Sequence, residues 1–171
     1  MKINVNEMEG IMNNLMANDV KAQYDRAFAT IRGIVEAFPE GKWLEPHGDA
    51  YYIPCRIAYH LAVFTDRFLA GGYKDPDFNA KLPFGNWMEA TAGTLPGKPA
   101  YLSYYDTVIE KAKKELAGLD DGILASPIAP EMIRLGSSQM GVHVYAMREL
   151  SAHTGELNKM LVEDGEDDVW R

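Results

Sequence analysis

Apolar side chains recur with helical spacing in four long segments, which proline- and glycine-rich stretches separate. The first segment covers residues 19–38 and ends before Pro39 and Gly41, with Asn18 or Asp19 available as its N-cap. Its apolar residues recur every three or four positions: Val20, Tyr24, Ala27, Phe28, Ile31, Ile34, Val35 and Phe38. This spacing places them on one face of a helix. We therefore predict an amphipathic helix over 19–38.

The second and third segments each begin with a proline, which suits the first turn of a helix because no N–H is needed there. Pro54 opens the second segment, 53–70, and two glycines close it. Pro99 opens the third segment, 99–118, and Gly118 is a plausible C′ residue. The inward positions again have helical spacing: Ile57, Leu61, Phe64 and Phe68 in the second, and Leu102, Tyr105, Val108, Ile109, Ala112 and Leu116 in the third.

The fourth segment, 137–163, is the longest, and a serine at 137 or 138 is its expected N-cap. Residues 6–17 are weakly helical and form either a separate short helix or an extension of the first. No convincing strand pattern or internal repeat is present. The sequence therefore predicts an all-α fold, a four-helix bundle in which the second and fourth helices bring polar groups to an inward face.

Two irregular connections separate the later helices. Residues 71–97 contain several prolines and glycines together with four aromatic anchors: Tyr73, Phe78, Phe84 and Trp87. A loop of this length is uncommon in a compact domain and often functional. We interpret it either as a cover over the core or as one wall of a substrate pocket, with a short helical turn at 86–92. The second connection, 119–135, is predicted to be a loop.

Length and composition favour one domain over residues 1–171, with its core at about 19–163. Hydrophobic residues make up 47% of the chain and charged residues 25%, which is typical of globular proteins. The formal net charge of −8 argues against nucleic acid as a partner, because phosphate binding needs a concentrated positive field. No apolar run is long enough to span a membrane. The N-terminus lacks the apolar core of a signal peptide, so we expect a cytoplasmic protein.

The candidate chemistry lies on the second and fourth helices. Glu149 and His153 are four residues apart and share the face that carries the apolar residues of the last helix. Burying a carboxylate and an imidazole without partners is costly, so they need a metal ion or a hydrogen bond between them. His60, beside the apolar stripe of the second helix, supplies a further ligand. Two histidines and one glutamate suit zinc with one open position, or non-haem iron.

The alternative is structural: His60 is a satisfied core histidine, and Glu149 pairs with Arg148, Lys159 or His153. Other polar residues are secondary candidates. Asp66 and Glu156 could orient the ligand histidines from behind. Three further residues are expected to have no part in the site: His143 at the margin of the face, a solvated His47 in a loop, and Cys55 as an inert buried thiol.

Two stretches of the chain resemble a known family. The sequence PCRIAYHLAVFTDRFL, followed after another helix by VYAMRELSAHTGELNKMLVEDG, is similar to the DinB-like superfamily of bacterial four-helix bundles. In that family a histidine on the second helix and an H-x-x-x-H-R-G-Q-type sequence on the last helix form a metal site. His60, in its H-L-A setting, matches the first histidine, and H-T-G-E-L at 153–157 parallels the family's H-R-G-Q-L. The resemblance covers about 19–163.

The chain departs from the family pattern at three positions. Glu149 stands where the family has the first histidine of the H-x-x-x-H pair, and Thr154 and Glu156 replace the usual arginine and glutamine. A carboxylate at 149 adds a negative charge, which either favours a divalent ion or marks a member that has lost tight metal binding. The ligand set that the resemblance implies is thus His60, Glu149 and His153, with zinc, nickel, iron or manganese as the metal.

The resemblance implies a metal-dependent hydrolase or a transferase that uses a small bacterial thiol. Its partner would be a small-molecule substrate or thiol, and the metal would activate water or the thiol. No phosphate-binding glycine loop, serine nucleophile motif or CxxC pair favours another chemistry. The competing interpretation is a non-catalytic stress-associated or ligand-binding bundle. A homodimer is also expected, with the aromatic residues Tyr101, Tyr104 and Tyr145 available for the contact.

Overall fold

The computed structural model describes residues 14–128 and 130–170 of the chain. Within these ranges it contains no β-strand, so the predicted all-α class is confirmed. The α-helices are α2 (Leu15–Ala37), α3 (Pro54–Phe68), α4 (Lys98–Ala117), the short α5 (Asp121–Ala125) and α6 (Gln139–Glu163). As predicted, Pro54 and Pro99 lie in the first turns of α3 and α4.

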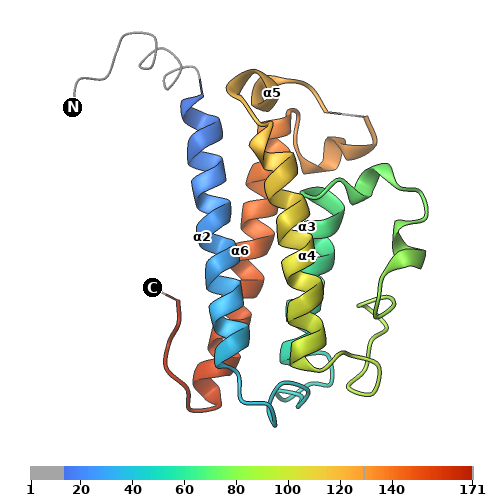
Figure 1. The fold of residues 1–171 in the computed structure, drawn as a ribbon, viewed down its shortest axis with the longest axis vertical. Coiled ribbons are helices and arrows are strands. Elements are labelled where there is room, and N and C mark those ends of the chain that lie inside the picture. The colour runs from blue at the N-terminus through green and yellow to red at the C-terminus, as the bar shows by residue number, and fades with distance from the viewer. Residues whose placement is uncertain (1–13, 129, 171) are drawn as a thin grey trace, which may run out of the picture.

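The long helices lie side by side as a bundle (Figure 1). α3 packs against α4 and α6, and α2 packs against the same two helices. Figure 1 shows α2 and α6 running in one direction and α3 and α4 in the other. Because α3 and α4 are parallel neighbours, the chain between them must return along the bundle, which for α4 alone is about 30 Å long. This requirement explains the length of the connection over 71–97.

Buried tyrosines join α4 to both of its neighbours. The hydroxyl of Tyr101 donates to the carbonyl of Ala58 on α3 at 3.1 Å, and that of Tyr105 donates to the carbonyl of Phe28 on α2 at 3.0 Å. Each hydroxyl needs such an acceptor, because an unpaired buried hydroxyl is costly. Tyr101 is completely buried, so the expectation that it takes part in a dimer contact is wrong.

The start of α2 lies one turn before the predicted one. The helix begins at Leu15 rather than Asp19, and its N-cap is Asn14, whose side chain makes no capping hydrogen bond. Instead, the carboxylate of Asp121 accepts from the backbone N–H of Ala17 at 2.8 Å. Part of the stretch 6–17 therefore extends the first helix, while residues 6–13 lie outside the described residues. The error arose because the capping group comes from α5, far along the chain.

The two connections also contain structure that was not predicted. Residues 119–135 are not a plain loop: they hold α5 and a 3₁₀-helix, Pro130–Leu135. The Asp120 side chain caps α5 by accepting from Ile123 N at 2.7 Å. In the longer connection, 3₁₀-helices form at Gly72–Lys74 and Phe78–Lys81, whereas 86–92 contains turns and no helix. Gly118 has a right-handed conformation (φ −79°), so it is not a left-handed C′ residue.

None of the helices in the described ranges combines the length and the apolar character that crossing a membrane requires.

Trp43 ties the α2–α3 connection to the end of the α3–α4 connection. It is 1% exposed, and its indole N–H donates to the carbonyl of Pro96 at 3.1 Å. We expect Trp43→Ala to lower the free energy of unfolding by about 3–5 kcal/mol, because it leaves a cavity and removes the indole hydrogen bond to the Pro96 carbonyl. Trp170, which is 41% exposed, is the matched control, and Trp170→Ala should cost less than about 1 kcal/mol. Urea unfolding followed by circular dichroism measures both; equal losses would contradict the prediction.

Candidate metal centre

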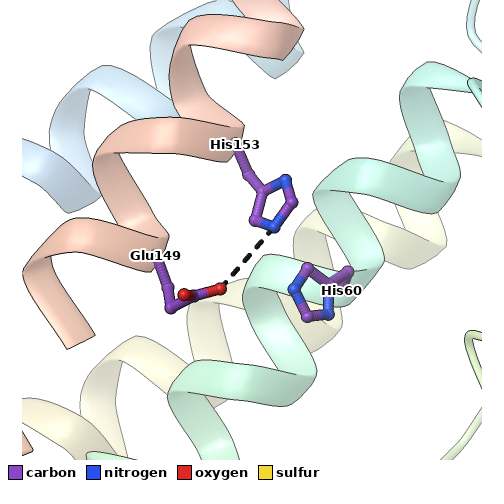
Figure 2. A group of neighbouring side chains, drawn as sticks. All are labelled: His60, Glu149 and His153. Carbon is purple, nitrogen blue, oxygen red and sulfur yellow. Dashed lines mark ion pairs between the residues drawn. The ribbon is translucent and has the colours of Figure 1, made fainter. Parts of the chain in front are cut away.

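The structure brings the predicted ligand residues together across the contact between α3 and α6. His60 lies near the middle of α3, and Glu149 and His153 lie one turn apart on α6. Figure 2 shows the three side chains turned toward one another. One potential ligand atom from each lies within 4.8 Å of the others, and within the described residues this is the one such group of His, Cys, Asp and Glu side chains.

The arrangement is slightly more open than a loaded metal site. His153 Nε2 lies 3.8 Å from Glu149 Oε2, and the His60 and His153 rings are perpendicular with centroids 4.6 Å apart. In a tetrahedral site with bonds of about 2.1 Å, ligand atoms are about 3.4 Å apart. The three side chains would thus have to close by about 1 Å, which changes in side-chain rotamers can supply.

His60 has an unpaired nitrogen in its neutral form. Its Nδ1 is buried and makes no hydrogen bond within the part of the chain that the structure describes. Burial, together with the nearby imidazole of His153, lowers the pKa of His60 to about 4, and the carboxylate of Glu149 opposes this shift. The imidazole is therefore neutral at pH 7, which is the form that binds metals. An unsatisfied buried nitrogen is uncommon and fits a missing partner such as a cation.

Glu156 orients His153. Its carboxylate lies 2.7 Å from His153 Nδ1, so this nitrogen carries the proton and donates it. The lone pair is then on Nε2, the atom nearest Glu149. Metal-binding histidines usually have such a carboxylate behind them, because it sets the tautomer and raises the basicity of the ring. The structure therefore agrees with the expected role of Glu156. Asp66 has no such role: it lies 3.1 Å from the Tyr104 hydroxyl and 3.5 Å from Lys111 Nζ.

Glu149 has one oxygen toward His153 and one toward solvent. Oε1 accepts from Arg148 Nη2 at 2.9 Å, as the structural alternative expected, and that arginine side chain is 69% exposed. An exposed ion pair of this kind contributes little and can be replaced by water. Lys159, the other basic partner that the structural alternative named, pairs with Glu163 instead. The second oxygen, Oε2, remains available to the group.

The other histidines and the cysteine lie outside the group. His143 Nδ1 is 3.0 Å from the Tyr24 hydroxyl, and burial lowers the pKa of this histidine, which confirms its packing role. His47 is not solvated as predicted: its side chain is 15% exposed, with Nε2 3.2 Å from Asp164 Oδ2. The Cys55 thiol is buried and donates to the carbonyl of Pro96, and burial raises its pKa. The thiol is buried, as expected.

Trp87, which sequence reasoning did not assign to the site, covers His60. The two ring centroids are 3.9 Å apart. The loop that carries Trp87 is attached to α3: Arg56 Nε donates to the Trp87 carbonyl at 3.2 Å, and the Tyr59 hydroxyl donates to the Gly85 carbonyl at 2.9 Å. A cavity of about 220 Å³ lies between α3 and this loop and includes His60 in its wall. The connection is thus both a cover and a pocket wall.

Comparison of the chain with protein-family models, with curated proteins and with solved structures gave no match.

The contact between Glu156 and His153 leads to a test on metal affinity. We expect Glu156→Gln to weaken binding of Zn²⁺ or Co²⁺ by about 10- to 100-fold, because the ring loses its carboxylate partner while all three ligands remain. Glu110→Gln is the matched control, since Glu110 is an exposed glutamate on α4, away from the group. Competition with a chromophoric chelator gives both affinities. An unchanged affinity in Glu156→Gln would show that Glu156 does not orient a ligand.

Proposed function

We propose that this protein is a metal-dependent enzyme of the DinB-like type, with a divalent transition metal held by His60, Glu149 and His153. The reaction would be hydrolysis, or group transfer to a small thiol. The observation that carries the proposal is the convergence of two imidazoles and one carboxylate from two helices, with ligand atoms within 4.8 Å. The buried, unpaired Nδ1 of His60 and the carboxylate behind His153 support it.

The donor set is suited to a catalytic rather than a closed structural site. Three protein ligands leave at least one position of a tetrahedral or larger coordination sphere open. When bound, the metal would supply Lewis acidity and lower the pKa of water or a thiol. The side chains of Glu149 and His153 are each 21% exposed, so a small molecule can approach from solvent. The Trp87 ring packs against the His60 ring, with the two centroids 3.9 Å apart.

Glu149 makes this ligand set different from a site with three histidine ligands. Its carboxylate brings one negative charge to a group that the Glu156 carboxylate already borders. This charge favours a divalent cation and makes a bound water or thiol less acidic than three neutral ligands would. The bound water or thiol would therefore be a stronger nucleophile once ionised, but a smaller fraction of it would be ionised at a given pH.

A structural role is the second candidate, and one observation favours it. Arg148, Glu149, His153 and Glu156 form a continuous series of polar contacts without any metal. In this case the series would be a set of ion pairs along α6, with the His60 ring of α3 packed against His153, and would bind no ion. The two candidates differ in one measurable property, the metal content.

We expect the metal-free protein to take up about one equivalent of Zn²⁺, Ni²⁺, Mn²⁺ or Fe²⁺ per chain. His60→Ala and His153→Ala should each weaken this binding by on the order of 100-fold or more, because two ligands cannot hold the ion as three do. His47→Ala is the matched control, since this histidine is bound to the end of α6 and lies outside the group. Elemental analysis and calorimetric titration provide the measurements.

Less than about a tenth of an equivalent with every metal would refute the metalloenzyme proposal and leave the structural role. Full occupancy in His153→Ala would show that the ligand set is wrong. Loading with Co²⁺ then separates the two reaction classes: added β-mercaptoethanol produces a thiolate-to-cobalt charge-transfer band if the open position accepts a thiol, whereas an unchanged spectrum favours hydrolysis.

A further inference from the structure

The polar lining of the cavity between α3 and the 71–97 connection contains one cationic side chain and several neutral ones. Arg67 from α3 and Asn79 and Asn86 from the loop line it, together with His60, and no acidic side chain does. This composition is notable in a chain with 25 acidic and 17 basic residues. An electropositive pocket in an acidic protein requires an explanation.

Hydrogen bonds around the cavity use up the acceptors and leave the donors free. Asn79 Oδ1 accepts from Arg67 Nη1 at 3.2 Å, and Asn86 Oδ1 accepts from the backbone N–H of Met88 at 3.1 Å. Each amide therefore keeps its NH₂ group for another partner, and the guanidinium keeps its remaining N–H groups. A ligand group that satisfies all of them must be an acceptor, and the positive charge of Arg67 favours a carboxylate over a neutral carbonyl.

Arg67 is held at the cavity without a counter-ion. Its guanidinium lies over the rings of Phe78 and Phe68, 5.8 and 6.0 Å from their centroids. It forms no ion pair with any carboxylate among residues 14–128 and 133–170, whose side chains the structure describes. A positioned guanidinium is the side chain best suited to bind a carboxylate through two hydrogen bonds.

The rest of the cavity lining is mainly apolar and aromatic. Val63 and Phe64 from α3 and Leu82 and Trp87 from the loop form its walls, and His60 belongs to the same wall. The volume of about 220 Å³ admits a molecule with one ring or a short branched chain. A ligand with its anionic end at Arg67 would extend its apolar body toward Trp87 and His60.

We propose that this cavity binds a small organic carboxylate, with the carboxylate on Arg67, Asn79 and Asn86 and an apolar body against Trp87 and Phe64. That such a molecule is the substrate rests on the proposed function, because the cavity and the metal group share His60. The binding itself requires no metal. Arg67 would determine the specificity of the cavity, because its positive charge favours anionic ligands.

The test uses benzoate as the probe and the full-length, metal-free protein. We expect one saturable site with a Kd of about 1 mM, as befits a ligand with few atoms. Benzamide, which has the same shape without the charge, should bind at least about 10-fold more weakly, and so should inorganic phosphate, which lacks the apolar body. Calorimetry and ligand-observed NMR measure the affinities.

Arg67→Gln should weaken benzoate binding by about 10-fold or more, because a charge-assisted bidentate contact is lost. Arg26→Gln is the matched control: Arg26 is exposed on α2 and away from the cavity, and benzoate affinity should stay within about twofold. Since Arg67 is also exposed, its replacement should leave the fold intact, which circular dichroism checks. Trp87→Phe should abolish the change in tryptophan fluorescence that benzoate causes.

Absence of saturable benzoate binding, equal affinity in Arg67→Gln and Arg26→Gln, or equal binding of benzamide or phosphate would each overturn the proposal. Metal titration of the same proteins separates its failure from that of the proposed function. Benzoate binding without metal binding would leave a carboxylate site in a non-metal protein. Metal binding without benzoate binding would leave the metal centre and remove this cavity as its substrate pocket.

Discussion

The packing of α3 against α6 is the contact on which the candidate site depends. It places His60 opposite Glu149 and His153, which no local feature of either helix could do. The same contact removes much of the water around these groups, and it keeps His60 neutral because a charged imidazole would be poorly solvated there. Three potential ligands, one of them with an unpaired buried nitrogen, then face a space that a small cation would fill.

The direction of the helices has a second consequence. Because α3 and α4 are parallel, their connection must return along the bundle, and it does so over the outer side of α3. Hydrogen bonds from Arg56 and Tyr59 attach it there through its carbonyl groups. The connection thereby supplies Trp87, Asn79 and Asn86 to a cavity that α3 alone could not form. Topology has thus created both the cover over His60 and the pocket beside it.

Charge has different signs on the two sides of His60. On the α6 side, Glu149 and the Glu156 carboxylate behind His153 make the surroundings negative, which suits a cation. On the loop side, Arg67 and the free amide donors make the cavity positive, which suits an anion. A carboxylate ligand and a divalent metal could thus bind next to each other. The carboxylate would use Arg67 and the amides, and the metal would use Glu149 and the histidines.

Helical periodicity, first-turn prolines and glycines determined the long helices, and they did so from the sequence alone, because these signals act within a few residues. The motif around His60 and His153 likewise predicted the group of side chains that the structure brings together. The early start of α2 was missed because its cap, Asp121, comes from another helix. The same holds for the half-buried His47 beside Asp164 and for Trp87 on His60. Each of these contacts joins residues far apart in the chain, so only the tertiary packing could decide it.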